Sequence, residues 1–323
     1  MKTIAIIIPV YNTTREMLLR CIESCISQTF QNIEIIIIND GSKNSETIDT
    51  LKVIKNNFSS KINIYHIDNR GASLARKYGV ENCNSDLIFF LDSDDYIENE
   101  TIQVLQKKQI EENYDVVIGQ FNVVSQNKVS EVKKFELISE KQNIIKSFLR
   151  GNIPITLWPN LYKKSLFQNV KFYDFPVGED LVINSQIFTQ PNLKISIINQ
   201  IVYNYYRHEG SLTKNISQEQ TRLGYMAFCK SLEIIRERID CSNLKIEIFI
   251  SKLNTLYAAL VLNSNVCKEI LFDLKKTENV IATKAFDNFT FQKKIIFLTI
   301  FKFPLTLPIV KFSIKIAKYF KSN

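Results

Sequence analysis

Four apolar runs recur in the first hundred residues of the chain, and stretches with helical spacing separate them. The runs cover residues 4–10, 33–39, 62–67 and 86–91. Between the first two runs, one face of a helix would carry Leu18, Leu19, Ile22, Cys25 and Ile26. Isoleucine-rich runs without polar interruptions are typical of strands that are covered on both faces, and their alternation with helices indicates a parallel sheet. The pattern therefore predicts an α/β fold, with a mostly parallel central sheet flanked by helices.

The hydrophobic pattern changes after residue 100 and again near residue 215. The expected elements are strands over residues 115–121 and 195–206, a helix over residues 139–149, and a polar hairpin or loop over residues 122–135. From residue 218 to about residue 276 the pattern is helical. We therefore expect a domain boundary near residue 215, followed by a helical C-terminal region over residues 216–323.

Each of the four runs ends in polar, turn-forming residues. The segments are Pro9-Val10-Tyr11-Asn12, Asn39-Asp40-Gly41-Ser42, Asp68-Asn69-Arg70-Gly71 and Asp92-Ser93-Asp94-Asp95. In parallel α/β sheets, ligands bind beyond the carboxyl ends of the strands. Together the segments offer a ring for stacking, a carboxylate for a base or ribose, a guanidinium for phosphate and paired carboxylates for a cation. The sequence therefore predicts a nucleoside-diphosphate pocket at this rim.

The acidic cluster of Asp92, Asp94 and Asp95 directly follows an apolar strand. Like charges at the end of a buried strand repel one another and are poorly solvated, so a bound cation would stabilise them. Because side chains at i and i+2 share one side of an extended chain, Asp92 and Asp94 are expected to face the same way. An acidic turn that caps a helix beginning near Glu98 is the alternative, and the cluster alone leaves both open.

The chain has a formal net charge of +8, and most of it lies near the C-terminus. Residues 281–323 contain eight lysines and one aspartate, a balance of +7. Their apolar blocks are shorter than the roughly 18 residues that a membrane-spanning helix needs. Lysines mixed with Phe and Ile are typical of a segment in a membrane interface, with a helical hairpin packed on the main domain as the alternative. The basic residues do not line an aromatic-studded face, so we do not expect nucleic-acid binding.

The apolar run at residues 4–10 is too short for a secretory leader and reads better as a first strand. The six cysteines form no CxxC pair, which argues against a zinc site or a disulfide framework. We therefore expect a cytoplasmic protein, held peripherally by its basic apolar tail on the inner face of the cell membrane.

Six segments of the chain resemble the successive motifs of family 2 glycosyltransferases. They are the four strand-end segments, with Ala75-Arg76 after the third, and then Gly178-Glu179-Asp180 and Arg207-His208-Glu209-Gly210-Ser211. They occur in the family's order and roughly its spacing over residues 3–215. The resemblance implies a GT-A fold, an inverting mechanism, Mn²⁺ or Mg²⁺ as cofactor and a nucleotide sugar, with a UDP-sugar expected, as donor.

The same resemblance implies a glycan or lipid-linked oligosaccharide as acceptor, in the synthesis of a bacterial cell-surface polysaccharide. In this interpretation residues 1–215 form the catalytic domain. Residues 1–100 would be its nucleotide-binding half and residues 101–215 its acceptor-binding half.

The resemblance assigns donor-binding roles to residues on the rim. Tyr11 would lie against the nucleobase, Asp40 would accept a hydrogen bond from the ring N–H of uracil, and the backbone near Pro9 would help. Arg70 and Arg76 are candidates for binding the pyrophosphate or for steadying the acidic cluster. For Arg76, which lies within a predicted helix, a structural ion pair is the alternative.

The resemblance also separates the carboxylates of the acidic cluster. Asp92 would contact the ribose or the metal shell, and Asp94 would coordinate the cation that bridges the diphosphate oxygens. His208 would complete the metal or phosphate shell, with a surface-loop histidine as the alternative. Asp95 would assist or would only cap the following helix.

The Glu179-Asp180 pair matches the family's catalytic base. Inversion needs a base opposite the leaving group, close enough to take the proton of the acceptor hydroxyl, and Asp180 would be that base. Two carboxylates favoured by the dipole at a helix start are the alternative. Glu179 and the only tryptophan, Trp158, are candidates for contacting the acceptor sugar, and for Trp158 a place in the core is the alternative.

Two other functions would use similar parts. A nucleotidyltransferase also binds metal through carboxylates, but Pro9-Val10-Tyr11-Asn12 lacks the glycine-rich phosphate loop that such an enzyme needs after its first strand. A catalytically silent nucleotide-sugar or glycan-binding subunit would be expected to lack Asp94 or Asp180, and the chain has both. The sequence leaves open the donor sugar, the acceptor, the linkage and the oligomeric state.

Overall fold

The computed structural model describes residues 3–58, 61–126, 128–135, 143–211, 216–261 and 265–275. The strands are β1 (Ile4–Val10), β2 (Ile33–Asp40), β3 (Ile62–Ile67), β4 (Leu87–Phe90), β5 (Tyr96–Ile97), β6 (Val116–Ser125), β7 (Lys128–Lys133), β8 (Asn160–Lys163) and β9 (Ile195–Tyr206). The helices are α1 (Arg15–Ile26), α2 (Ser45–Phe58), α3 (Gly71–Asn82), α4 (Thr101–Glu111), α5 (Asn143–Arg150), α6 (Glu179–Phe188), α7 (Gln218–Arg238), α8 (Lys245–Val261) and α9 (Cys267–Lys275). Short 3₁₀ turns, η1 (Lys164–Phe167) and η2 (Ser242–Leu244), follow β8 and α7.

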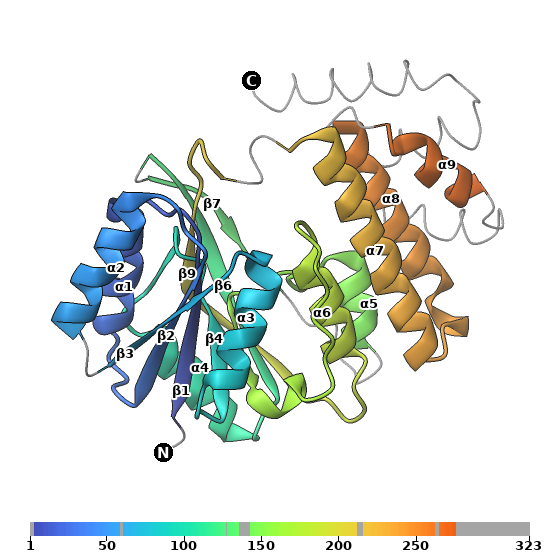
Figure 1. The fold of residues 1–323 in the computed structure, drawn as a ribbon. Coiled ribbons are helices and arrows are strands. Elements are labelled where there is room, and N and C mark those ends of the chain that lie inside the picture. The colour runs from blue at the N-terminus through green and yellow to red at the C-terminus, as the bar shows by residue number, and fades with distance from the viewer. Residues whose placement is uncertain are drawn as a thin grey trace.

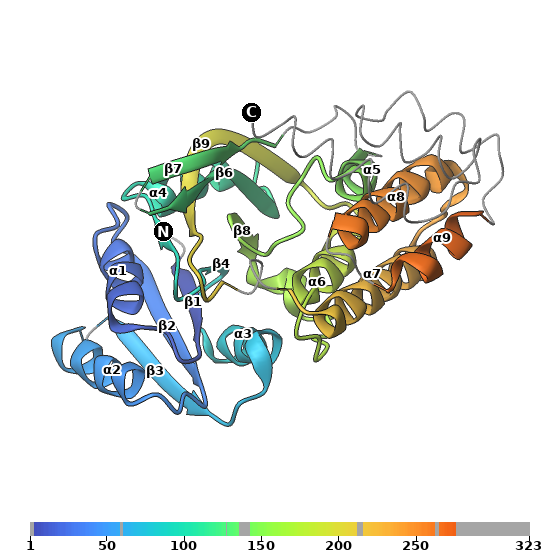
Figure 2. The same ribbon diagram turned by 90° about the horizontal axis from the view of Figure 1, so that it is seen from above.

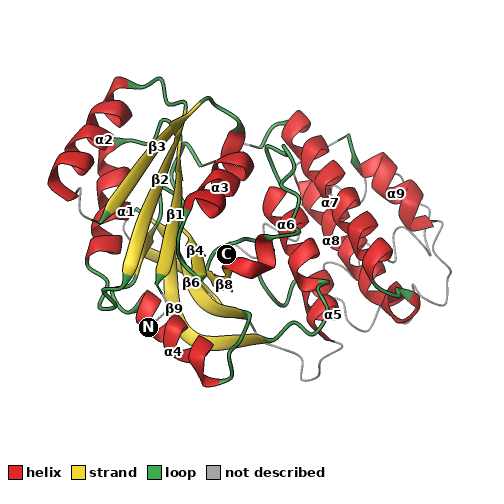
Figure 3. Cartoon of the chain, turned by 60° about the horizontal axis from the view of Figure 1, so that its bottom comes forward, coloured by secondary structure: helices red, strands yellow, loops and turns green. Residues whose placement is uncertain are grey.

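The strands form one mixed sheet in the order β3-β2-β1-β4-β8-β6-β9-β5, and β7 pairs with β6 outside this path. β3, β2, β1 and β4 run parallel, β8 runs antiparallel to both of its neighbours, and β6 and β9 are again parallel. Figure 3 shows β1, β2 and β3 side by side, with α3 next to them. The prediction of an α/β fold with a mostly parallel sheet flanked by helices is confirmed.

Successive side chains of β1 point to opposite faces of the sheet and pack against helices on both faces. Ile6 and Ile8 pack with helices α1, α2 and α4 in one core cluster, whereas Ile7 packs with α3 and α6 in another. All three isoleucines are fully buried, and burying each such side chain stabilises the fold by about 1.5–3 kcal/mol. In Figure 2, α1 and α2 lie on one side of the first strands and α3 lies on the other. A core on each face therefore fixes the carboxyl ends of the strands.

Some elements differ from the sequence prediction. β6 continues through Ser125 and forms a hairpin with β7, which decides between the hairpin and the loop expected for residues 122–135. The strands β5 and β8 are absent from the prediction, whereas α4 is the helix expected to begin near Glu98. β8, between β4 and β6, has four residues, too few for an alternating pattern to be read from the sequence.

Helices follow β9, as the pattern after residue 215 predicts. α7 begins with a capping box: the Ser217 hydroxyl accepts from the Gln220 N–H, and the Gln220 side chain accepts from the Ser217 N–H. α7 packs along α6 and α8 packs on α5, so the C-terminal helices adjoin the sheet domain (Figure 1). No helix within the described ranges has the length and apolar character needed to cross a membrane. The basic apolar tail over residues 281–323 lies outside the described residues.

Candidate functional site

Hydrogen bonds join the ends of β1, β2 and β4 into one rim. The Asn12 N–H donates to Ser42 Oγ at 3.0 Å, and Asn12 Oδ1 accepts from two backbone N–H groups of the β2–α2 loop. The hydroxyls of Thr13 and Ser93 lie 2.6 Å apart. These bonds hold three loops against one another at the carboxyl ends of their strands, where the sequence predicts a ligand site.

Asp40 ties the end of β2 to the start of α3. Its Oδ1 accepts from the Arg70 N–H and its Oδ2 accepts from the Gly71 N–H, both at 2.8 Å. Gly41 has φ +66°, and a Cβ there would lie 2.7 Å from the Asn69 nitrogen, so no larger residue fits this turn. Asp40 is 3% exposed. The carboxylate that we expect to meet a uracil N–H therefore also fastens the backbone of the neighbouring loop.

Tyr11 and Arg70 present exposed side chains at the same rim. Tyr11, just after β1, is 51% exposed, and Arg70, just before α3, is exposed as well. Pro9 is partly buried within β1. The Tyr11 ring and the Arg70 guanidinium therefore have the accessibility that stacking on a base and pairing with a phosphate require.

Asp95 is the buried member of the acidic cluster. Its Oδ2 accepts from the Tyr203 hydroxyl and its Oδ1 accepts from the Tyr206 N–H, each at 2.7 Å. Burial raises the pKa of the Asp95 carboxyl well above its usual range, and the neighbouring acidic charges add to the shift. Of the two roles left open for Asp95, the structure does not support the helix cap, because the N-cap of α4 is Glu100. Asp95 instead fastens the end of β4 to β9.

Asp94 and His208 meet at the open side of the cluster. His208 Nε2 lies 3.0 Å from Asp94 Oδ2, and the two side chains are 21% and 32% exposed. Arg20 Nη2 donates to the Asp94 carbonyl oxygen at 2.9 Å and so holds the turn. The described residues contain no group of three or more His, Cys, Asp or Glu side chains arranged for a metal ion. The Asp94 carboxylate fits a cation that takes its other ligands from water and phosphate oxygens, as Mg²⁺ does at nucleotide sites, and the His208 imidazole offers a nitrogen donor beside it.

Arg76, on α3, bonds both to Asp92 of the acidic cluster and to the Glu179-Asp180 pair. Nη2 donates to Asp92 Oδ1 at 2.7 Å, and Nη1 donates to Glu179 Oε1 at 2.9 Å and to Asp180 Oδ1 at 3.3 Å. The Arg76 side chain is 4% exposed. Burial lowers its pKa, but the three carboxylates outweigh this effect and raise the pKa well above the ordinary value. The structural ion pair considered for Arg76 is therefore present, and it engages both Nη atoms.

Asp180 lies in the first turn of α6, where the helix dipole favours a carboxylate. Its Oδ2 accepts from the Leu157 N–H at 3.1 Å, and its side chain is 14% exposed. Burial raises the pKa of Asp180 to about 7; Arg76 opposes this shift, whereas the Glu179 and Asp92 carboxylates add to it. A carboxyl group with a pKa near neutrality can both take up and release a proton at physiological pH.

Trp158 is a core residue. It is 8% exposed and stacks on Tyr203, with ring centroids 4.5 Å apart and ring planes 9° apart. Tyr205 stacks on the same indole with centroids 5.5 Å apart. This packing leaves little indole surface for an acceptor sugar, so the core alternative describes Trp158 better than the sugar platform does.

The sequence analysis does not predict two groups that bond to carboxylates of the site, the Tyr203 hydroxyl and the Leu157 N–H. The Tyr203 hydroxyl, which bonds to Asp95, comes from a strand that the pattern predicts, but the pattern does not say which polar group the ring would meet. The Leu157 group that bonds to Asp180 is a backbone N–H, which any residue except proline has, so the sequence carries no signal for it.

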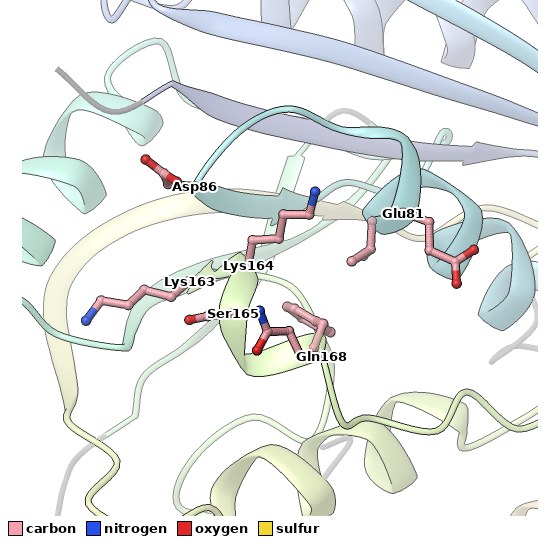
Figure 4. A pocket seen from close by; sticks show the side chains of 8 residues that line it. Glu81, Asp86, Lys163, Lys164, Ser165 and Gln168 are labelled. Atoms are coloured by element: carbon pink, nitrogen blue, oxygen red, sulfur yellow. The ribbon is translucent and has the colours of Figure 1, made fainter.

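A hollow of about 680 Å³ lies at the other end of β4 (Figure 4). Its lining residues are Val80, Glu81, Asp86, Lys163, Lys164, Ser165, Phe167 and Gln168. Lys163 Nζ bonds to Asp115 Oδ1 at 2.7 Å and Lys164 Nζ donates to the Cys83 carbonyl oxygen at 2.6 Å, so both ammonium groups are engaged within the protein. Because Asp86 precedes β4 and the acidic cluster follows it, this hollow is separate from the rim.

Residues 5–171, just over half of the chain, match the family profile described as Glycosyl transferase family 2. The chain belongs to this family. The resemblance carried by the sequence motifs is thereby confirmed. The matched range ends before α6, so Glu179 and Asp180 lie beyond it.

Two bacterial relatives are similar to this glycosyltransferase over most of its length. Glycosyltransferase GlyA of Streptococcus pneumoniae serotype 4 is 31% identical over 230 residues, which cover 65% of this chain but only 31% of GlyA. The putative glycosyltransferase EpsH of Bacillus subtilis is 26% identical over 274 residues, which cover 82% of this chain and 76% of EpsH. The matched region thus spans about a third of GlyA and about three quarters of EpsH.

The crystal structure of residues 1–349 of S. aureus TarS has a similar fold. Its TM-score is 0.65 at 14% sequence identity, and the match covers 99% of this chain and 92% of the TarS chain. At this identity the likeness concerns the fold alone. The expected GT-A fold with C-terminal helices is confirmed.

Proposed function

We propose that this family 2 glycosyltransferase is an inverting, metal-dependent enzyme that moves a hexose from a nucleotide sugar to a hydroxyl group of an acceptor. The observation that supports this most is the Asp180 carboxylate, which shares the Arg76 guanidinium with Asp92 and has a pKa raised to about 7 by burial. A proton acceptor and a donor-side carboxylate thus lie in one bonded cluster. Such proximity suits direct transfer, because the sugar and its attacker must meet in one place.

In the proposed reaction Asp180 takes the proton of the acceptor hydroxyl while the hydroxyl oxygen attacks the anomeric carbon. The new carbon–oxygen bond forms as the bond from that carbon to the diphosphate oxygen breaks, and the diphosphate leaves with the electron pair. Attack from the face opposite the leaving group inverts the anomeric configuration and needs no covalent enzyme intermediate. Glu179, beside the base and 16% exposed, is proposed to contact the acceptor.

The rim is proposed to bind the nucleoside diphosphate of the donor. The exposed Tyr11 ring would stack on the nucleobase, Asp40 and the Pro9 backbone would meet the edge of the base, and the exposed Arg70 guanidinium would meet a phosphate. S. aureus TarS has also been crystallised in complexes with UDP and with UDP-GlcNAc. Because the present chain shares that fold, we propose a UDP-sugar as its donor.

We propose Mn²⁺ or Mg²⁺ as the cofactor, with Asp94 and His208 as protein ligands and Asp92 beside them. The cation would neutralise charge that develops on the departing diphosphate. The Asp94–His208 pair supports this role, because both side chains are partly exposed and their polar atoms lie 3.0 Å apart. The buried Asp95 would hold the turn through its bonds to Tyr203 and Tyr206 of β9.

For the acceptor we propose a glycan or a lipid-linked oligosaccharide of a bacterial cell-surface polysaccharide, assembled at the inner face of the membrane. The eight lysines among residues 281–323 support a peripheral place at an anionic surface. Removing residues 292–323 should therefore move the protein from the membrane fraction to the soluble fraction. Unchanged partitioning would exclude the tail from this role.

A donor screen tests the proposed function. The full-length protein is incubated in Mn²⁺ with UDP-, GDP- and dTDP-sugars, and release of the nucleoside diphosphate is measured with and without acceptor glycans. We expect binding and turnover of a UDP-sugar and a product of inverted anomeric configuration. Failure to bind any nucleotide sugar would contradict the proposal, and donor binding without turnover would favour a silent binding subunit instead.

A further inference from the structure

Helix α7 lies directly against the start of α6. Gly178, the N-cap of α6, has φ +85°, and a Cβ placed there would lie 2.9 Å from the Ala227 Cβ and 3.8 Å from the Gly224 Cα. Cβ atoms do not approach one another this closely, so no side chain fits at residue 178 while α7 stays in place. The backbone that leads into Glu179 and Asp180 therefore touches α7.

The contact between the two helices continues along α6. Val182, one turn after the N-cap, forms a buried cluster with Ala227 and Ile234 of α7. At the far end of α6, Arg238 Nη1 donates to the Gln186 carbonyl oxygen at 2.8 Å. Figures 1 and 2 both show the two helices side by side. α7 thus contacts α6 from the first turn of α6 to the last turn of α6.

Different groups hold the first turn of α6 from the side of the sheet. Arg76 bonds to Glu179 and Asp180, and the Leu157 N–H donates to Asp180. α7 belongs to the helical part of the chain beyond the range that matches the family profile. The turn that carries the base is therefore packed between an ion cluster and a helix from a different part of the chain.

We propose that α7 is a positioning element for the base: its small residues Gly224 and Ala227 set the depth at which the first turn of α6 places the Asp180 carboxylate beside Arg76. This inference rests on the proposed function of Asp180. Ala227 acts through the backbone of Gly178 and touches no substrate. Because a misplacement of about 1 Å can lower an enzymatic rate by about 10²-fold, added volume at residue 227 should lower kcat.

The test compares Ala227→Val, which adds volume at the start of α6, with Arg238→Met, which removes a bond at the other end of the same helix pair. We expect Ala227→Val to lower kcat by about tenfold or more with an unchanged Kd for the donor, and to move the pKa of Asp180 as measured by ¹³C NMR. Arg238→Met should reduce thermal stability yet leave kcat and that pKa unchanged. Equal losses of kcat in both variants, or a folded Ala227→Val protein with wild-type kcat and Asp180 pKa, would overturn the proposal.

A rescue experiment covers the case in which Ala227→Val does not fold. Gly178→Ala introduces the close contact from the side of α6, and Ala227→Gly removes the atom that the new Cβ would meet. Gly178→Ala should lower kcat, and the double variant should recover part of the loss, although strain at positive φ remains. Absence of any recovery would overturn the proposal. The NMR readout needs no turnover, so a wild-type protein that uses no donor would contradict the proposed function while the pKa comparison still tests the role of α7.

Discussion

The two acidic pairs of this glycosyltransferase are built in different ways. Asp92 and Asp94 follow a buried strand, and their turn is held by Thr13 of the β1–α1 loop and by Arg20 of α1. Glu179 and Asp180 begin a helix, and their surroundings come from three separate parts of the chain: α3, the loop before β8, and α7. The strand that precedes the first pair therefore brings it to the rim, whereas only tertiary packing places the second.

The two pairs also differ in how exposed their side chains are. The Asp94 side chain is 32% exposed and lies beside His208, whereas the Asp180 side chain is 14% exposed. An open carboxylate suits a cation that also needs ligand oxygens, and a buried one suits a base, because burial raises its proton affinity. Arg76, which bonds to both pairs, therefore contacts carboxylates with different requirements.

Asp180→Asn should produce the largest effect and should separate the two pairs. It removes the proposed proton acceptor but leaves the carboxylates proposed for the donor side in place, so kcat should fall by about 10²–10⁴-fold while the Kd of the donor stays that of the wild type. Steady-state kinetics and calorimetry measure the two quantities. Asp49→Asn, an exposed carboxylate on α2, serves as the control and should change neither. Near wild-type turnover in Asp180→Asn would exclude Asp180 as the base.

Arg76→Gln should weaken both pairs at once. It leaves three carboxylates without their common partner, and loss of one member of a buried ion pair costs about 3–5 kcal/mol of unfolding free energy. Because Arg76 lowers the pKa of Asp180, its removal should also shift the pKa of that carboxyl further upward. Urea unfolding and the pH dependence of kcat/KM measure the two effects.

The matched control for this variant is Arg222→Gln. Arg222 is exposed and pairs only with Glu219 among the ion pairs of the described residues, and such pairs contribute about 0–1 kcal/mol. An unfolding cost for Arg76→Gln no larger than that for Arg222→Gln would show that the buried cluster does not hold the two pairs together.

Tyr203→Phe should have a smaller effect, confined to the strand-end pair. It keeps the ring that stacks on Trp158 but removes the hydroxyl that bonds to Asp95, at a cost of about 1–3 kcal/mol of unfolding free energy. If this turn holds the proposed cation, the variant should require more Mn²⁺ for half-maximal activity, with the pKa of Asp180 unchanged. Tyr162→Phe removes another buried hydroxyl, bonded to Asn160 and Asn184, and should leave the Mn²⁺ requirement unchanged. The same Mn²⁺ requirement in both variants would argue against a link between Tyr203 and the cation.

The strand-end half of the site is predictable from the sequence because its signals are local. Uninterrupted apolar runs identify β1 to β4, and parallel strands end at one edge of a sheet, so Tyr11, Asp40 and Asp92 are expected to share a rim. The second half depends on contacts over long distances along the chain. Arg76 lies 103 positions from Glu179 and 104 positions from Asp180 along the chain.

Burial is the other quantity that the sequence does not supply. The sequence does not decide whether Trp158 lies in the core or forms a platform for a sugar. It also does not decide whether Asp95 assists the acidic cluster or caps the following helix. Only the packing of β9 against the acidic turn shows that Tyr203 stacks on Trp158 and bonds to Asp95. The closeness of α7 to Gly178 likewise depends on which helices meet, which a helical pattern alone does not specify.

The pH dependence of kcat/KM is the sharpest test of Asp180 as the proposed base. Asp180 must be ionised to accept a proton, and burial raises its pKa to about 7, so the carboxyl is protonated and inactive below that pH. We predict that log kcat/KM rises with a slope of about one as the pH increases, and levels off above a midpoint near 7. The residual activity of Asp180→Asn should lack this limb. A midpoint near the ordinary aspartate value of 3.8, or a limb that persists in Asp180→Asn, would contradict the assignment of Asp180 as the buried base.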